Sequence, residues 1–372
     1  MTENTGVYIH FPFCRSKCPY CHFSSVPFRA DLFALWMEGI EREIAATPAI
    51  AGVVDTLYIG GGTPSLMNPG DLRRLRSLLG GHFRLRLEEF TIEANPARAD
   101  ATDFEGWRDA GVDRLSVGIQ SFSDGMLGTL GRGYSSTDAA ACLRAARKAG
   151  FTNIALDLMI GIPTETGEDL EDTLKSALDF GPDHVSLYIL ENIEGLPFEA
   201  FVRDHPPDDD RTAEAYDRMR EGLEAAGLKR YEISNFALPG KECRHNLKYW
   251  RYEPFLGFGP SASSHMGGRR WTNKTRIEDW ASALEAGADP RDEDKALTPM
   301  DRLREAVVFG LRLVRGVGVE DLKRRFGFDV LDIYRKEISG LRAEGMLILE
   351  GDTLRIADDT FLISNGVFTK FV

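Results

Sequence analysis

The 372-residue sequence has few cysteines and no long apolar run. Five cysteines are too few and too unevenly placed for a disulfide scaffold, and an odd number points instead to metal binding or catalysis. No stretch approaches the ~20 apolar residues of a membrane-spanning helix. The first residues lack the basic and apolar regions of a secretory signal, so we expect a cytoplasmic protein.

Positive charge is also scarce. The chain has 45 Lys and Arg against 58 Asp and Glu, which gives a net charge of −13. This acidic balance argues against broad nucleic-acid binding, and we expect no nucleic-acid partner. At about 150 residues per domain, the length predicts two or three domains.

The first two-thirds of the chain alternates short apolar runs with longer helix-like stretches. Such alternation predicts β/α units around a parallel sheet. About six units are too few for a closed eight-stranded barrel, so we expect a partial (β/α)6 barrel with its site at the carboxyl ends of the strands. The predicted strands are residues 7–10, 54–59, 89–93, 114–117, 154–159 and 184–190. The predicted helices are residues 33–46, 69–79, 124–130, 136–149, 170–180 and 212–226.

The remainder of the chain has a different pattern. Residues 236–290 are rich in Gly, Ser, Trp and Arg and predict loop with short elements. After Thr298, an apolar stripe from Leu303 to Val314, helices at 319–326 and 330–343, and a hairpin at 346–357 predict a winged-helix-like unit. We therefore expect a core domain at 1–235, a linking region at 236–294 and a C-terminal domain at 295–372.

The strongest motif is Cys14-x3-Cys18-x2-Cys21, directly after the first predicted strand. A short loop of this kind can wrap a cubane iron–sulfur cluster with three thiolates, which leaves the fourth iron open, as a catalytic metal site requires. A zinc site that uses His10 or His22 as fourth ligand is the alternative. Zinc usually takes cysteines in pairs with a second distant pair, and the sequence contains no second pair.

Polar and glycine-rich positions follow several other predicted strands. Gly60-Gly61-Gly62-Thr63-Pro64 comes one β/α unit after the cysteine motif, and glycines there allow a ligand to approach the backbone. Glu93, Gln120 and Asp157 stand at or near the ends of successive strands. Each could be an ordinary cap or loop residue, but together they predict a binding site at the barrel mouth.

The cysteine motif, with Tyr20 before its last cysteine, resembles that of the radical S-adenosylmethionine (SAM) superfamily. This resemblance implies a [4Fe-4S] cluster on Cys14, Cys18 and Cys21 whose open iron chelates SAM. It also implies that the glycine-rich segment holds the SAM amino group and that Arg132 binds the SAM carboxylate. The implied SAM-contacting positions are Tyr8, Gly61, Gly62, Thr63, Glu93, Gln120, Arg132 and Asp157. The related coproporphyrinogen-oxidase-like branch commonly has His where this chain has Tyr134.

Within that branch, the chain resembles the HemW family of heme-binding proteins over nearly its whole length. The oxidase pattern has a fourth cysteine where this chain has Phe23 and a longer segment before the cluster, whereas only 13 residues precede Cys14. His245-Asn246-Leu247-Lys248-Tyr249-Trp250 matches the His-Asn-x-x-Tyr-Trp motif of HemW proteins. The resemblance implies a heme chaperone. The alternatives are oxygen-independent coproporphyrinogen III oxidase and a radical SAM enzyme that opens or methylates a tetrapyrrole ring.

The motif at 245–250 also has a physical interpretation. His245 is a potential axial ligand to heme iron, and Arg244, Lys248 and Arg251 form a basic cluster suited to heme propionates. The alternative for His245 is a satisfied core histidine. Cys243 is a second possible ligand, although an inert buried thiol is the simpler expectation for it and for Cys142.

The family resemblance extends to partners. It implies heme or another tetrapyrrole as the bound molecule and a respiratory membrane protein as the heme acceptor. It also implies an electron donor such as flavodoxin or ferredoxin. The protein would be cytoplasmic and would meet the membrane surface only while it delivers heme.

Overall fold

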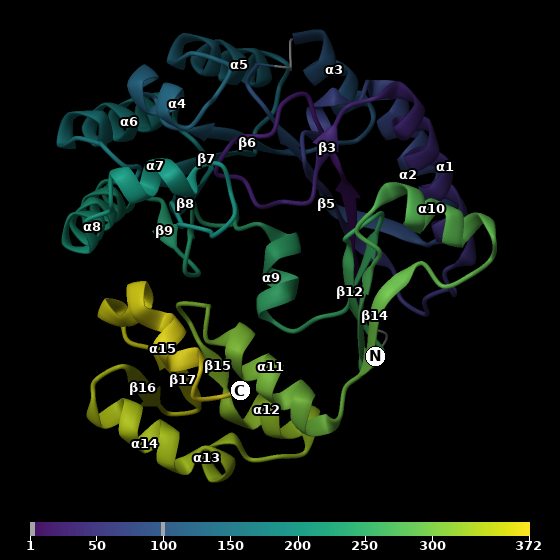
Figure 1. The fold of residues 1–372 in the computed structure, drawn as a ribbon. Coiled ribbons are helices and arrows are strands. Elements are labelled where there is room, and N and C mark those ends of the chain that lie inside the picture. The colour runs from purple at the N-terminus through teal and green to yellow at the C-terminus, as the bar shows by residue number, and fades with distance from the viewer. Residues whose placement is uncertain (1–3, 98–100) are drawn as a thin grey trace.

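The computed structural model describes residues 4–97 and 101–372. Its main feature is a curved 12-stranded sheet with the order β14-β13-β12-β11-β1-β4-β5-β6-β7-β8-β10-β9. The six predicted strands form its parallel centre, which confirms the partial barrel (Figure 1). They are β1 Thr5–Phe11, β4 Val54–Gly61, β5 Leu85–Ala94, β6 Arg114–Gln120, β7 Ile154–Ile160 and β8 His184–Ile189.

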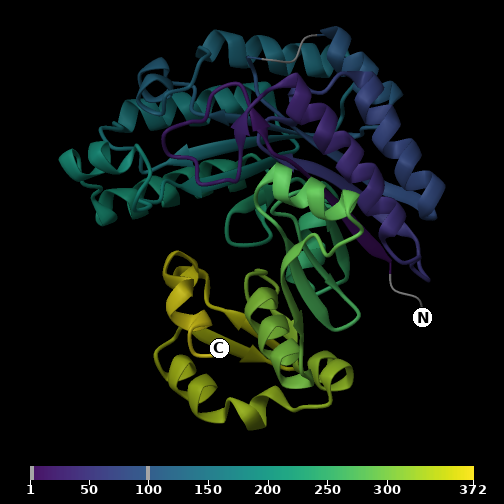
Figure 2. The same ribbon diagram turned by 45° about the vertical axis from the view of Figure 1, so that its right-hand side comes forward.

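The helices between these strands, and those that follow β8, flank the sheet, and most of them cover its outer face (Figures 1 and 2). Several begin with a capping box, in which an Asn, Ser or Thr side chain and an Asp three residues later satisfy free amide groups at the helix start. These helices are α1 Ala30–Ala46, α2 Pro69–His82, α3 Ala101–Asp109, α4 Asp124–Thr129, α5 Ser136–Lys148, α6 Gly167–Phe180, α7 Glu199–Asp204 and α8 Asp209–Ala225. The short strands β2 Phe13–Cys14 and β3 Val26–Pro27 pair within the cysteine loop, and η1 Pro64–Leu66 follows β4.

The region 236–290, predicted as loop with short elements, instead extends the main sheet. Strand β11 pairs in parallel with β1, and β12 to β14 continue antiparallel from it. These strands lack the alternating apolar pattern that marks a half-buried strand. The clearest case is β14, which is Arg-Asp-Glu-Asp-Lys-Ala and mostly exposed. The elements are β9 Lys229–Arg230, β10 Asn235–Ala237, α9 Arg244–Trp250, β11 Phe255–Phe258, β12 Ser263–Met266, β13 Arg269–Asn273, α10 Ile277–Glu285 and β14 Arg291–Ala296. The division at 1–235, 236–294 and 295–372 stays a prediction.

The C-terminal unit has its own apolar core and a three-stranded sheet with the order β15-β17-β16. The predicted hairpin is β16 and β17, and the short third strand, β15, was not predicted. Two details of the prediction were wrong. The helix predicted at 330–343 breaks at Tyr334, and Leu311 and Val314 follow the end of α11 instead of continuing its stripe. The elements are α11 Pro299–Gly310, β15 Val317–Gly318, α12 Val319–Phe326, α13 Val330–Ile333, α14 Arg335–Ala343, β16 Leu347–Glu350, β17 Thr353–Ile356, η2 Asp358–Ile363 and α15 Ser364–Phe368.

The helix α9 occupies the space between the barrel and the C-terminal unit (Figure 1). Its last residue, Trp250, lies near Phe309 of α11, with ring centroids 6.4 Å apart, and the Arg312 guanidinium stacks 4.4 Å from the Trp250 ring. This helix therefore contacts both parts of the molecule. In the part of the chain that the structure describes, no helix combines the length and apolar character needed to cross a membrane.

Candidate functional site

The cysteine loop follows the carboxyl end of β1, and His10 of that strand binds the loop through the Ser24 carbonyl. The His10 ring lies between the Tyr8 hydroxyl, 3.0 Å from Nδ1, and the Ser24 carbonyl, 2.8 Å from Nε2. Trp36 Nε1 donates to the His10 carbonyl at 3.1 Å. Both ring nitrogens of His10 are thus already engaged, which leaves the exposed His22 as the nearer candidate for the alternative zinc site.

Cys14, Cys18 and Cys21 are free thiols and half-buried. Thr63 Oγ1 donates to Cys14 Sγ at 3.4 Å, and Arg132 donates to Cys18 Sγ at 3.3 Å. Burial raises the pKa of Cys21, and the neighbouring cysteines raise it further. Across the described ranges, no three Cys, His, Asp or Glu side chains already converge as metal ligands. The donor set nevertheless fits a cluster bound through three thiolates, because donors that offset negative sulfur already contact two of them.

The glycine turn after β4 packs directly on the cysteine loop. Gly62 N–H donates to the Phe11 carbonyl and Thr63 N–H to the Phe13 carbonyl, both at 2.7 Å. A Cβ atom on Gly62 would lie 2.4 Å from the Phe13 carbonyl oxygen, so this close approach requires glycine. The structure therefore brings the predicted residues Gly61, Gly62 and Thr63 to the cluster loop.

Two predicted carboxylates, Glu93 and Asp157, come from neighbouring parts of the barrel interior. Glu93 accepts from Gly61 N–H and from the Tyr58 hydroxyl, both at 2.9 Å. Ser116 Oγ donates to Asp157 at 3.1 Å. Burial, together with the charge of Asp157, raises the pKa of Glu93 to about 7. Tyr58 and Ser116 were not among the predicted site residues, because an isolated Tyr or Ser inside a strand carries no motif.

Arg132 connects the end of β6 to the cysteine loop. Its guanidinium donates to the Gly118 carbonyl at 2.8 Å, to the Tyr134 hydroxyl at 2.9 Å and to the Tyr20 hydroxyl at 3.3 Å. Tyr134 lies 3.2 Å from Gln120 Oε1 and also donates to backbone carbonyls of β6. Tyr134, the departure from the related branch, therefore holds Arg132 and Gln120 together at the strand end.

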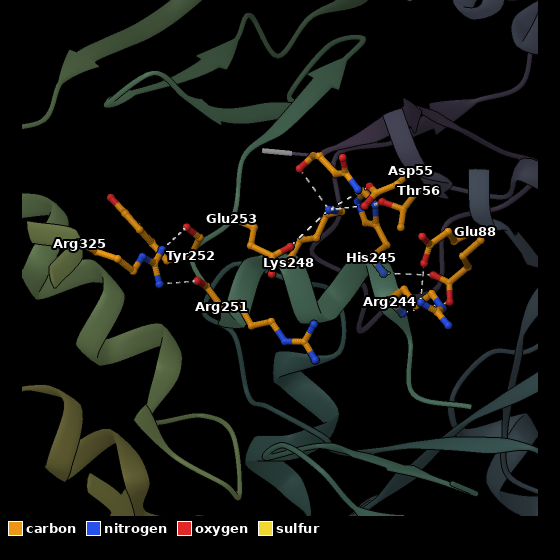
Figure 3. A network of polar contacts seen from close by, with 12 residues as sticks. Asp55, Thr56, Glu88, Arg244, His245, Lys248, Arg251, Tyr252, Glu253 and Arg325 are labelled. Atoms are coloured by element: carbon orange, nitrogen blue, oxygen red, sulfur yellow. Dashed lines mark hydrogen bonds and ion pairs between the residues drawn. The ribbon is translucent and has the colours of Figure 1, made fainter. Parts of the chain in front are cut away.

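The histidine of the His-Asn-x-x-Tyr-Trp motif is completely buried on α9 (Figure 3). Its Nδ1 lies 2.9 Å from Thr56 Oγ1 and its Nε2 lies 2.8 Å from the Tyr249 hydroxyl. Burial, together with the nearby charges of Lys248 and Arg114, lowers the pKa of His245 to about 3, so the ring is neutral. Both nitrogens have partners, as expected for a satisfied core histidine. The ligand role predicted for His245 stays a prediction.

Glu89 on β5 fixes the start of α9, and sequence reasoning did not identify it. Its carboxylate accepts from Arg244 N–H at 3.0 Å and from His245 N–H at 3.1 Å. Cys243 Sγ lies 3.5 Å from the same carboxylate, and burial raises the pKa of that thiol to about 12, as expected for an inert thiol. The available signal was an acidic residue directly before the apolar half of the strand.

The basic cluster predicted around the motif is mostly neutralised. Arg244 pairs with Glu88 at 2.6 Å, and the buried Lys248 pairs with Asp55 at 2.9 Å and with Glu253 at 3.3 Å (Figure 3). The three cations therefore do not form one free anion site, because two of them have carboxylate partners from other parts of the chain. Among the described residues, the Arg251 side chain has no hydrogen-bond or ion-pair partner.

Two family models match the chain. The model of the radical SAM superfamily matches residues 8–177, and that of the HemN C-terminal domain matches residues 297–359. The first range holds the cysteine loop, the glycine turn and the residues at the strand ends. The fold and this site thus define a radical SAM protein, the class that the cysteine spacing predicted, and this class implies a [4Fe-4S] cluster and SAM as cofactors.

Curated relatives match nearly the full length. Heme chaperone HemW of Bacillus subtilis is 32% identical over 99% of this chain and 99% of its own length. Heme chaperone HemW of Mycobacterium tuberculosis strain H37Rv is 35% identical, over 97% of this chain and 93% of its own. The chain belongs to the HemW family.

One solved structure matches the whole chain. Coproporphyrinogen III oxidase (HemN) from Escherichia coli superposes with a TM-score of 0.86 at 22% sequence identity and covers 100% of this chain and 90% of its own. At that identity the likeness establishes the fold, including the C-terminal unit, and not the activity.

Proposed function

We propose that this protein is a heme chaperone that holds a [4Fe-4S] cluster with SAM and delivers heme to respiratory-chain membrane proteins. The full-length match to heme chaperones of the HemW family is the observation that carries the proposal. The chaperone works in the cytoplasm and meets the membrane surface during delivery. A small electron carrier, flavodoxin or ferredoxin, reduces the cluster.

Cys14, Cys18 and Cys21 would hold the cluster. When bound, a reduced cluster supplies the electron for reductive cleavage of SAM. Arg132, which donates to Cys18 Sγ, would bind the SAM carboxylate through the paired N–H groups of its guanidinium. Glu93 and the glycine turn would orient the amino group. The remaining proposed SAM contacts are Tyr8, Gly61, Gly62, Thr63, Gln120 and Asp157.

SAM binding is expected to depend on pH through Glu93. Its pKa is raised to about 7, so it is largely protonated at pH 5.5 and ionises as the pH rises. Because the ionised carboxylate attracts the cationic amino group of SAM, we expect the affinity to rise about tenfold between pH 5.5 and 7. Equilibrium dialysis of SAM against reconstituted protein measures this rise. Glu93→Gln serves as the control, and in this variant the SAM affinity should not change with pH. An unchanged pH dependence in the variant would show that Glu93 is not the titrating group.

Oxidation of coproporphyrinogen III is the main alternative function. The full-length likeness to HemN concerns the fold. By the family pattern, Phe23 stands where the oxidase has its fourth cysteine. Ring opening or methylation of a tetrapyrrole is the third candidate. Anaerobic reconstitution with SAM and reductant, with coproporphyrinogen III or hemin added, separates the candidates. The chaperone takes up hemin and forms no protoporphyrinogen; protoporphyrinogen formation would establish the oxidase.

Replacing His245 by alanine is expected to weaken hemin binding tenfold or more. The variant removes the hydrogen bonds to Thr56 and Tyr249 that fix α9, the helix that carries the His-Asn-x-x-Tyr-Trp motif. Absorption titration with hemin measures the affinity and the ligand-sensitive bands together. An unchanged affinity and spectrum would refute any role of His245 in heme binding.

A further inference from the structure

A cleft of about 830 Å³ separates the barrel from the C-terminal unit. On the barrel side it is lined by Asn4, Asp55 and Pro254, which lie at or just before the starts of β1, β4 and β11. On the other side it is lined by the segment 313–318 and by α12. The cleft therefore lies at the amino ends of the parallel strands, whereas the cysteine loop and glycine turn follow their carboxyl ends. Its volume suits a ligand larger than a simple ion.

Two arginines in this cleft lack partners. Lys248 is paired with Asp55 and Glu253, and Arg325 donates to the Arg251 and Tyr252 carbonyls and lies 3.6 Å from Asp321. The side chains of Arg251 and Arg315 have no hydrogen bond or ion pair within 4–97 and 101–372. Partial burial lowers the pKa of Arg315, the charge of Arg251 lowers it further and Glu253 opposes the effect. Both arginines line the same cleft.

The same cleft also has apolar residues in its otherwise polar lining. Trp250, Leu313, Val317 and Leu322 line it together with Ala306. The indole Nε1 of Trp250 is buried and has no hydrogen-bond partner, which leaves one donor unsatisfied. Two unpaired arginines beside an indole ring and aliphatic side chains are the features expected of a site for an apolar ring that carries two acidic groups.

We propose that this cleft is the heme site and that Arg251 and Arg315 bind the two propionates of the macrocycle while its ring packs on Trp250 and the apolar wall. The proposal rests on heme as the bound molecule of the proposed function. No His, Cys or Met side chain lines the cleft among the described residues, and the hydroxyl of its tyrosine, Tyr252, already donates to Glu305 at 2.7 Å. The propionates and ring therefore supply the affinity, and the iron does not. His245 keeps its two hydrogen bonds and acts as a positioning residue for α9.

This placement separates heme from the proposed SAM site. Strand β1 has seven residues and spans roughly 20 Å between the two ends of the barrel. The helix α9 and its buried contacts lie between them. A radical formed at the cysteine loop would therefore not reach the bound macrocycle directly, which suits a carrier better than an enzyme that modifies the tetrapyrrole.

Titration of the reconstituted full-length protein with three porphyrins tests the proposal. Hemin and metal-free protoporphyrin IX should bind within about threefold of each other, and protoporphyrin IX dimethyl ester, which lacks both carboxylates, about 100-fold more weakly. The double variant Arg251→Glu, Arg315→Glu should lose about 100-fold in affinity for both acids, tenfold or about 1.4 kcal/mol for each arginine. Arg73→Glu with Arg144→Glu, two exposed arginines on the outer helices, makes the same charge change and should bind like the unmodified protein.

Each contrary result has a distinct meaning. Full hemin affinity in the Arg251, Arg315 double variant would overturn the arginine site. Binding of metal-free porphyrin at least tenfold more weakly than hemin would also overturn it. In both cases the protein would still bind heme, so the proposed function would stand. Failure of the unmodified protein to bind hemin would overturn the proposed function. If the double glutamate variant does not fold, Arg251→Gln with Arg315→Gln carries the test, with the same loss expected in direction and about tenfold in size.

Discussion

Replacing Cys18 by alanine is expected to abolish the iron–sulfur absorbance of the reconstituted protein. A [4Fe-4S] cluster held by three thiolates cannot keep its place on two, and the described residues offer no spare cysteine in this loop. The expected loss is complete, in both the visible absorbance and the iron bound per chain. SAM cleavage should disappear with it, because no electron reaches SAM without the cluster.

Cys142→Ala is the matched control for this experiment. Cys142 is also a free thiol, but it is buried on α5, and burial raises its pKa to about 12. A thiol of that pKa does not supply a thiolate near neutral pH, so the variant should bind iron like the unmodified protein. A full cluster in Cys18→Ala, or equal loss in both variants, would contradict the assignment of the three-cysteine loop.

Replacing Glu89 by alanine is expected to cause the largest loss of stability among single substitutions at α9. The variant leaves the amide group of Arg244 and the buried amide group of His245 without an acceptor. It also removes a negative charge that raises the pKa of the fully buried Arg114. A buried hydrogen-bonding group left without its partner typically costs about 1–3 kcal/mol, and Glu89 accepts from two amide groups. Urea denaturation should therefore show a markedly lower midpoint.

Glu88→Ala provides the control for that measurement. Glu88 is the neighbouring residue and pairs with Arg244 at 2.6 Å, but both side chains are more than half exposed. Exposed ion pairs contribute about 0–1 kcal/mol, so its midpoint should barely change. Equal destabilisation by the two substitutions would mean that Glu89 does not anchor α9.

The sequence was sufficient for the barrel and for the cysteine loop because their signals are local. Apolar runs and caps predicted the six central strands within a few residues, and three cysteines within eight positions defined the cluster class. The strands β11 to β14 were missed because they are short and because most of them consist of polar residues or contain glycine. They form strands only because the exposed edge of β1 is available for pairing.

Long-range pairing explains why the basic cluster was misjudged. Arg244 and Lys248 appear unpaired in the sequence, but their partners Glu88 and Asp55 lie 156 and 193 positions away. Arg251 and Arg315 belong to different parts of the chain, and only the fold brings them to one cleft. The sequence therefore shows which cationic residues are present, but only the structure shows which of them form ion pairs.

The same distinction applies to His245. Its sequence context predicts a heme ligand, while its surroundings in the structure occupy both ring nitrogens. A ligand role would require His245 to exchange the Tyr249 hydroxyl for iron, and a positioning role would require no change. Comparison of hemin with metal-free porphyrin in His245→Ala separates the two roles, because only the ligand role depends on iron.

Heme transfer in the presence of a scavenger tests the chaperone function most directly. Reconstituted protein loaded with hemin is mixed with the heme-free form of a respiratory membrane enzyme and an excess of apomyoglobin, which captures free heme. The chaperone function predicts that the enzyme acquires heme from the loaded protein, but not from an equal amount of free hemin under the same conditions. Capture of all the heme by apomyoglobin in both cases would contradict it.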